Sequence, residues 1–344
     1  MPSFIRSGLL GLSSFIVYRH CAPHLIKPLT RMMSASTIDK ASLESFHAHL
    51  GQSKRILALL GAGLSASSGL PTFRGAGGLW RTHDSTSLAT PEAFARDPGL
   101  VWQFYNYRRH MALKAQPNAA HYALAELARK VPDFQTLSQN VDGLSQRAEH
   151  PPKQLQLLHG TLFELKCADR QCSYRMMNFT DPVTPALAIP TDGADPTSNE
   201  ARNAASASEF QAKDLDISDV NVQLPSLALH DLPRCPKCDR NLLRPGVVWF
   251  GESLPSGVLA NVANFMKSEE DVDLMMVIGT SAQVHPAAGY IDIARSKGAR
   301  ICVVNMDTND APASGWAEGD WLFQGDATVI VPELLKPITG DVEL

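Results

Sequence analysis

The sequence lacks a hydrophobic run long enough to cross a membrane, and it has no excess of basic residues. A membrane-spanning helix needs about 20 consecutive apolar residues, and no stretch of the chain provides them. The 344 residues carry a net charge of -4, so no broad positive surface is available to bind nucleic-acid phosphates. With 44% hydrophobic residues, the composition is that of a globular protein. We therefore expect one large domain with a smaller lobe, and no nucleic-acid or membrane partners. We also expect a monomer.

Acidic residues are absent from positions 1–38, which contain several Arg and Lys residues among short apolar groups. This composition is typical of a mitochondrial transit peptide. We therefore predict a matrix protein whose mature chain begins between Arg31 and Lys40. A disordered cytosolic extension is the alternative, and a start at Met32 or Met33 would give a cytosolic or nuclear pool.

A glycine turn follows the apolar run Ile56–Leu60, which we predict to be a buried strand. Gly61, Gly63 and Ala66 have the G-x-G-x-x-A spacing of a dinucleotide-binding turn. A dehydrogenase would continue with a helix and a strand that ends in Asp or Glu about twenty residues on. This chain continues instead with the loop sequence PTFRGAGGLW. A hydride-transfer enzyme is therefore disfavoured, although it remains an alternative.

Strand and helix patterns alternate along much of the chain. The sequence of residues Thr90–Lys130 predicts helices, which begin at Thr90 and are interrupted at Gln116–Asn118. Further strands are predicted in DFQTLSQN, DLMMVIGTS and ARICVVN. This order predicts an α/β fold, a Rossmann-like parallel sheet with helices on both faces, plus a smaller zinc-binding and helical lobe. Asp181–Pro233 differs, because it has nine acidic and two basic residues, and we expect a loosely ordered insertion there.

Four of the six cysteines form two closely spaced pairs, Cys167 with Cys172 and Cys235 with Cys238. Two such pairs brought together would make a closed tetrahedral site for one structural zinc ion. The long gap between the pairs is compatible with this site, because loop-closure entropy grows only logarithmically with length. A disulfide or unrelated thiols are the alternative. Cys21 lies in the predicted transit peptide, and Cys302 lies in an apolar strand, where we expect a core residue.

Polar residues follow several of the predicted strands. Gln139, Asn140 and Asp142 lie in SQNVDGL, and His159 lies in LHGTL. Because the carboxyl ends of parallel strands share one edge of a sheet, these residues could meet at a ligand site. A lone histidine before a glycine is by default a turn residue, since a role as a base depends on geometry and partners.

Taken together, these motifs resemble those of the sirtuins, the NAD-dependent protein-lysine deacylases. The glycine turn, PTFRG, QNVD, HG, the cysteine pairs, GTS and Asn305 occur in the family's order from about Ser53 to Pro332. The resemblance implies that NAD is a consumed co-substrate, and that the acyl group moves from lysine to ADP-ribose as nicotinamide leaves. It also implies a catalytic domain at 39–340, with an NAD-binding lobe at 40–75, 128–162 and 240–335, a helical part at 76–127, and a zinc module at 163–239 that contains the insertion at 181–233.

The resemblance also assigns roles to individual residues. It makes His159 the general base on the ribose hydroxyl. The implied NAD contacts are Gly61, Ala62, Gly63, Ser65, Thr72, Phe73, Arg74, Gln139, Asn140, Asp142, Gly279, Thr280, Ser281, Asn305 and Ala327. The implied contacts with acyl-lysine are Ala89, Tyr105, Arg108, Val248, Trp249, Phe250, Gly251 and Glu252.

Within the family, FYNYRRH and LATPEAFA resemble the subgroup that removes malonyl, succinyl and glutaryl groups. Tyr105 and Arg108 are three apart and share a helix face, where a phenol and a guanidinium could bind a distal carboxylate. A solvated helix face is the alternative for this pair. The family also contains deacetylases and ADP-ribosyltransferases, and a zinc-organised binding module without catalysis is a further alternative. Two departures are the wide C-x4-C pair and Ala327, where the subgroup has a cysteine.

Overall fold

The computed structural model describes residues 38–72, 78–191, 213–307, 312 and 314–342. The predicted transit peptide at 1–38 lies almost wholly outside these residues. Within the described ranges, no helix combines the length and the apolar character needed to cross a membrane.

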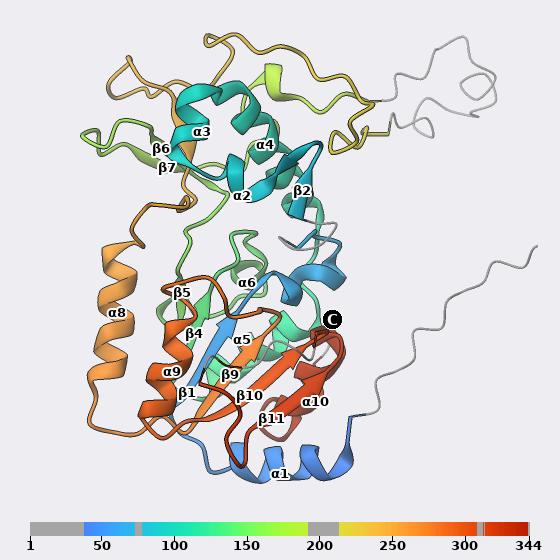
Figure 1. The fold of residues 1–344 in the computed structure, drawn as a ribbon, viewed down its shortest axis with the longest axis vertical. Helices are drawn as coiled ribbons and strands as arrows, with labels where there is room; N and C mark the ends of the chain where they lie inside the picture. Colours follow the sequence, from blue (N-terminus) through green and yellow to red (C-terminus); the bar gives the residue numbers. More distant parts are fainter. Residues whose placement is uncertain (1–37, 73–77, 192–212, 308–311, 313, 343–344) are drawn as a thin grey trace, which may run out of the picture. The chain divides into compact units, whose positions relative to one another are not determined.

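A six-stranded parallel sheet forms the centre of the larger lobe (Figure 1). Its strand order is β11-β10-β9-β1-β4-β5, and all five pairings are parallel. The strands are β1 (Ile56–Leu60), β4 (Phe134–Ser138), β5 (Leu155–Leu157), β9 (Leu274–Ile278), β10 (Arg300–Asn305) and β11 (Trp321–Gln324). The predicted Rossmann-like sheet is confirmed, including the four strands expected from apolar runs.

Helices cover both faces of this sheet. One face packs against α1 (Lys40–Leu50), α5 (Ala119–Lys130) and α10 (Ala327–Thr339), and the other packs against α8 (Ser256–Lys267) and α9 (Gly289–Ser296). Strand β1 shows why. Ile56, Ala58 and Leu60 belong to one core cluster, while Leu57 and Leu59 belong to the other, and all five side chains are fully buried. Truncating such a residue to Ala would cost about 2–5 kcal/mol.

The smaller lobe combines helices with two short antiparallel sheets. Helix α3 begins after Thr90, as predicted, and the Thr90 side chain accepts the Ala93 amide hydrogen bond. Helix α4 ends at Lys114, and Asn118 caps α5, as expected from the break at QPN. The elements are β2 (Leu79–Trp80), β3 (His83–Asp84), α2 (Ser85–Leu88), α3 (Pro91–Arg96), α4 (Pro98–Lys114), β6 (Glu164–Cys167), β7 (Arg175–Met177) and β8 (Leu243–Pro245). Among the short helical segments, η4 (Pro185–Leu187) packs against α4, whereas η1 (Ala62–Ser68), α6 (Leu144–Arg147) and η3 (Pro152–Gln154) pack against elements of the larger lobe.

Two elements near the predicted lobe boundaries pack as follows. Helix α5 packs against α10 and the sheet of the larger lobe. Strand β8 pairs with β6 in the three-stranded sheet β7-β6-β8 of the smaller lobe. In both cases the apolar face of an element decides which lobe it joins.

The acidic insertion is more ordered at its described ends than we expected. Leu187, Ile217 and Leu232 are all buried in the core of the smaller lobe. Thr191 and Asp214 form an antiparallel bridge across the gap in the described residues. A few apolar residues among the acidic ones are therefore enough to attach both ends of the insertion to the smaller lobe.

Candidate active site and metal centre

The glycine turn after β1 packs closely against the loop after β9. Gly61 donates its amide hydrogen bond to Ile278 at 2.9 Å, and Gly63 donates to Gly279 at 2.8 Å. A Cβ on Gly61 would lie 2.5 Å from Cβ of Thr280, and one on Gly63 would lie 2.7 Å from Cα of Gly279. Gly279 has a φ of 62° and leaves no room for a side chain against η1. Glycine is therefore needed here so that the two strand ends can approach each other.

A buried polar group lies beside this turn. Ser65 Oγ donates to Asp142 Oδ2 at 2.7 Å, and Asn140 Nδ2 donates to the Gly61 carbonyl at 3.0 Å. His121 Nε2 lies 3.4 Å from Ser65 Oγ. Burial lowers the pKa of His121 to about 4, although Asp142 acts in the opposite direction. The imidazole is therefore neutral at physiological pH, and Ser65 fixes the Asp142 carboxylate.

The other predicted NAD contacts gather at Thr280. Gln139 Nε2 donates to Thr280 Oγ1 at 3.1 Å, and Asn305 Nδ2 donates to the Thr280 carbonyl at 3.2 Å. Ser281 follows and is half-buried. Ala327 begins α10 and is only 5% exposed. The structure thus brings the ends of β4, β9 and β10 together, as expected for the carboxyl edge of a parallel sheet.

His159 lies just after β5, with Nδ1 3.1 Å from the carbonyl oxygen of Gln139. A carbonyl only accepts, so Nδ1 carries the hydrogen and Nε2 is left as the proton acceptor. Burial lowers the pKa of His159, and the hydrogen bond to Gln139 raises it in part. The His159 carbonyl also accepts the Val248 amide hydrogen bond at 2.9 Å. The imidazole is thus neutral and oriented by Gln139, and the His159 backbone is tied to the predicted substrate segment.

Phe73 and Arg74 lie outside the described residues, so their predicted contact with NAD stays a prediction. Thr72, the last described residue before them, is half-buried. Ala62 and Ser65 lie in η1, directly after the glycine turn.

Tyr105 and Arg108 lie one turn apart on α4. Tyr105 is fully buried, and Trp249 Nε1 donates to its hydroxyl oxygen at 2.9 Å. Burial raises the pKa of Tyr105 to about 12, while Arg108 acts to lower it. The Arg108 guanidinium carbon lies 5.6 Å from the Phe104 ring centre. Burial lowers the pKa of Arg108, and Tyr105 and Asp142 raise it in part. Arg108 therefore interacts with the Asp142 carboxylate, which also accepts the hydrogen bond from Ser65.

Backbone amides of the predicted substrate segment Val248–Glu252 are already hydrogen-bonded. In addition to the Val248 bond, Trp249 donates its amide to Glu252 Oε2 at 2.9 Å. Phe250 donates its amide to the Ala89 carbonyl at 2.9 Å, and Ala89 is only 6% exposed. Gly251 has a φ of 84°, which lies in the left-handed region that favours glycine. These bonds join the segment to both lobes.

Glu252 is held by Arg244, a residue that the sequence did not single out. Arg244 Nη1 and Nη2 donate to the two Glu252 carboxylate oxygens at 2.6 and 2.9 Å. Burial raises the pKa of Glu252, but hydrogen bonds from Arg244 and the Trp249 amide lower it overall. The Arg244 guanidinium carbon lies 3.2 Å from the Trp249 ring centre. Glu252 and Arg244 therefore support the Trp249 ring, which in turn contacts Tyr105.

Sequence reasoning also missed His121. Its only local signal is its place as the third residue of α5, where it completes a capping box with Asn118. A capping role does not predict contact with Ser65, because that contact joins segments distant in the sequence.

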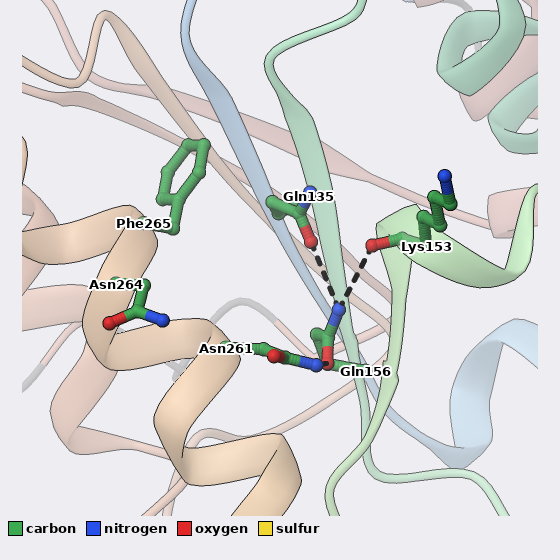
Figure 2. Close-up of a pocket in the computed structure, with 6 residues that line it drawn as sticks. All are labelled: Gln135, Lys153, Gln156, Asn261, Asn264 and Phe265. Atoms are coloured by element: carbon green, nitrogen blue, oxygen red, sulfur yellow. Dashed lines mark hydrogen bonds between the residues drawn. The ribbon is translucent and has the colours of Figure 1, made fainter.

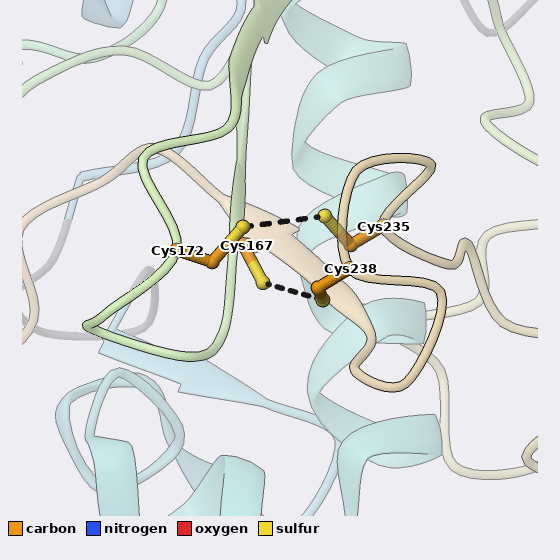
Figure 3. A group of neighbouring side chains, drawn as sticks. All are labelled: Cys167, Cys172, Cys235 and Cys238. Carbon is orange, nitrogen blue, oxygen red and sulfur yellow. Dashed lines mark hydrogen bonds between the residues drawn. The ribbon is translucent and has the colours of Figure 1, made fainter.

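The four paired cysteines meet at one point in the smaller lobe (Figure 3). Their sulfur atoms all lie within 4.8 Å of one another. Cys167 Sγ lies 3.7 Å from Cys238 Sγ, and Cys172 Sγ lies 3.7 Å from Cys235 Sγ. Zn–S bonds of about 2.3 Å in a tetrahedron place the sulfurs about 3.8 Å apart. The cluster therefore fits a structural zinc ion, and the wide C-x4-C spacing does not prevent it.

The backbone favours the thiolate at Cys238, whereas burial raises the pKa of the Cys167 thiol. Hydrogen bonds from the amides of Arg240 and Asn241 lower the pKa of Cys238 to about 6. Cys302, in contrast, is fully buried in β10, where burial raises its pKa, and it is a core residue as expected.

A separate open pocket of about 400 Å³ lies between α8 and the β4–β5 edge of the sheet (Figure 2). Gln156 Nε2 donates to Gln135 Oε1 at 3.2 Å, and Asn261 Nδ2 donates to Gln156 Oε1 at 3.1 Å. Lys153, Asn264 and Phe265 also line the pocket. Its amides largely satisfy one another, and none of the predicted site residues contributes to it.

Comparisons with known proteins agree with this geometry. The Sir2 family profile matches residues 61–286. The NAD-dependent protein deacylase of Candida albicans is 45% identical over 303 residues, which cover 87% of this chain and 99% of the relative. The mitochondrial NAD-dependent protein deacylase sirtuin-5 of Danio rerio is 39% identical over 283 residues, which cover 80% of this chain and 81% of the relative.

A solved structure described as a Sir2 homolog–NAD complex superposes with a TM-score of 0.64. It is 34% identical, and the match covers 87% of this chain and 93% of that chain. The chain therefore belongs to the Sir2 family, a family that uses NAD as a co-substrate. This confirms the resemblance and the fold class predicted from the sequence.

Proposed function

We propose that this NAD-dependent protein deacylase of the sirtuin family removes acidic acyl groups, namely malonyl, succinyl and glutaryl, from protein lysine side chains. The observation that carries the proposal is the pair formed by Tyr105 and Arg108. Trp249 donates to the Tyr105 oxygen, which leaves the phenol hydrogen for another acceptor. A substrate carboxylate could accept it, and Arg108 would supply the opposite charge.

NAD would lie along the carboxyl edge of the sheet. The glycine turn would hold the pyrophosphate, Asn140 and Asp142 would position the nicotinamide and its ribose, and Ser281 and Asn305 would hold the adenosine half. The backbone of Ala327 would contribute at the adenine, since its side chain is buried. Phe73 and Arg74 would shield the reacting sugar from water.

His159 would remove the proton from the ribose hydroxyl. Its Nε2 is available for this step because Nδ1 is bonded to Gln139. Before this step, the acyl carbonyl oxygen would bond to C1′ of the ribose as nicotinamide leaves. The deprotonated hydroxyl oxygen would then bond to the acyl carbon, the lysine nitrogen would leave as a protonated amine, and one water molecule would complete 2′-O-acyl-ADP-ribose. A related structure at 34% identity is described as a complex with 2′-O-acetyl ADP ribose, which is the acetyl form of the expected product.

The peptide around the acyl-lysine would lie along the segment from Val248. Because the amides of Val248, Trp249 and Phe250 are already bonded, we expect pairing through the carbonyl groups of this segment and the residues after Gly251. The exposed Phe250 ring would contact the lysine chain.

We also propose a mitochondrial location, since the acid-free residues 1–38 have the composition of a transit peptide. The sirtuin-5 relative of Danio rerio is named mitochondrial. N-terminal sequencing of protein from cells should find a start between Arg31 and Lys40. An intact Met1 on a cytosolic species would contradict the proposal.

The test of acyl preference is a panel of peptides that differ only in the acyl group. Arg108→Met should lower kcat/KM for succinyl-lysine roughly a hundredfold or more, about 3 kcal/mol, because the carboxylate is left buried without its partner. Acetyl-lysine has no such group, so its rate should be unchanged or higher. Arg96→Met, on the exposed end of α3, is the matched control. Parallel changes for both substrates in Arg108→Met would refute the carboxylate contact.

A further inference from the structure

The acidic insertion contacts α4 along one stripe of that helix. Gln103 Nε2 donates to the Pro225 carbonyl at 2.8 Å, and Tyr107 donates its hydroxyl to Asp216 Oδ1 at 3.1 Å. Residues 103, 107, 110 and 114 recur at the spacing of one helix face. Tyr105 and Arg108 point away from this stripe. The two faces of α4 therefore meet the insertion and the candidate acyl site respectively.

Four charged residues on and beside this stripe form what we call the insertion clamp: His110, Lys114, Asp181 and Asp214. His110 Nδ1 lies 2.7 Å from Asp181 Oδ2, and His110 Nε2 lies 3.1 Å from Asp214 Oδ2. Lys114 also pairs with Asp214. Asp181 lies in the described segment before residue 192, and Asp214 lies in the described segment that begins at 213. One imidazole therefore joins both described ends of the insertion to α4.

The clamp requires a charged imidazole. A neutral ring donates from only one nitrogen, whereas both nitrogens of His110 face carboxylates. The His110 side chain is 14% exposed, so solvent does not replace these bonds. The hydrogen bond to Asp181 raises the pKa of His110, while burial and Lys114 act to lower it. The charge of Asp214 also raises the pKa of His110. Arg109 lies next to His110 in α4, and its charge interacts with that of Asp181.

The insertion is also fixed from its other side. Arg81 Nη1 donates to the carbonyls of Ile217 and Asp219, and Nη2 donates to that of Val220, at 2.9 to 3.0 Å. Arg81 belongs to the short β2–β3 connection. The returning segment is therefore held between this connection and α4, and it restrains the position of the helix.

We propose that His110 is a positioning residue for acyl recognition, which ties both ends of the acidic insertion to α4 and so fixes the helix that carries Tyr105 and Arg108. The link to acyl recognition rests on the proposed function, whereas the attachment of the insertion does not. Because the pKa of His110 is raised on folding, the clamp stabilises the protein fully below the unfolded value of about 6.5 and loses this effect as pH rises through the folded pKa.

The first experiment measures melting temperature from pH 6 to 9 for the full chain, His110→Gln and His110→Lys. We expect the difference between wild type and His110→Gln to be largest at pH 6 and to shrink toward pH 9. His110→Lys carries a permanent charge and should keep its stability across this range. Glu44→Gln, which removes the exposed Lys40–Glu44 pair on α1, is the control. A difference that does not depend on pH would overturn the clamp.

The second experiment compares kcat and KM for succinyl and acetyl peptides at pH 6.5. If part of the free energy of one charged hydrogen bond in the clamp contributes to binding at the acyl site, His110→Gln should raise KM for the succinyl peptide about threefold to tenfold. The value of kcat and the acetyl reaction should be retained. His110→Lys should restore the succinyl KM. Equal losses on both peptides would show a structural role only and overturn the positioning role. If Arg108→Met leaves the preference unchanged, the proposed function fails, while the melting curves still decide the clamp.

Discussion

Removing the Tyr105 hydroxyl tests the candidate acyl site most sharply, because two separate effects are expected. Tyr105→Phe removes the acceptor of the Trp249 indole N–H, which lies 2.9 Å from it in the buried core. An orphaned buried donor costs about 1–3 kcal/mol of stability. In the reaction, the loss of the hydrogen bond that this uncharged hydroxyl donates to the substrate carboxylate should cost about 1.5 kcal/mol, or roughly tenfold in kcat/KM for the succinyl peptide.

A double-mutant cycle with Trp249→Phe separates these effects. Trp249→Phe also removes the unpaired donor, so the double variant should be less destabilised than the sum of the single variants by about 1–2 kcal/mol in urea unfolding. Succinyl recognition should not recover in the double variant, since the hydroxyl is still missing. Because burial raises the pKa of Tyr105 to about 12, the phenol stays neutral over the assay range and the effect should not change from pH 7 to 9.

Two results would refute this reasoning. Additive stability losses would mean that the indole–phenol contact contributes nothing specific. Equal loss of acetyl and succinyl activity in Tyr105→Phe would mean that the hydroxyl supports the fold and not the substrate carboxylate.

Three further predictions concern the metal centre, the base and acid stability. Cys235→Ser should reduce zinc content well below one ion per chain and lower the melting temperature by roughly 5–10 °C; full zinc by mass spectrometry would contradict it. His159→Ala should lower kcat at least a hundredfold with NAD binding retained, and half of the wild-type activity would exclude His159 as the base. Burial lowers the pKa of His150 to about 4, so the unfolded state gains a proton first and stability should fall between about pH 6.5 and 4. His150→Gln should make the melting temperature fall less steeply between these pH values. If the slope of melting temperature against pH does not change, groups other than His150 cause the decline.

The elements that the sequence predicted are those with one dominant local signal. Strand β1 is a continuous apolar run that ends at glycine, and α3 begins at a Thr-Pro pair. Both signals act within a few residues, so no distant partner is needed. Strands β5 and β11 were missed because β5 has only three residues and β11 alternates buried and exposed positions at the sheet's edge.

The candidate site was predictable as a set of motifs and not as a network. The cysteine pairs and the glycine turn each indicate a chemistry by their spacing. His121 and Arg244 gave no such signal, because the first acts through Ser65 and the second through Glu252 and Trp249. Contacts of this kind join residues distant in the sequence, so spacing along the chain does not predict them.

The bridge between Thr191 and Asp214 has a practical consequence for protein engineering. Paired residues of antiparallel strands lie only about 5 Å apart, so Thr191 and Asp214 are close neighbours in space. A two-residue Asn-Gly hairpin turn is the shortest connection suited to such a pair. Residues 192–213 are therefore a place where the chain could be shortened to a tight turn, or a reporter domain inserted, with the cysteine cluster and α4 left in their own sequence.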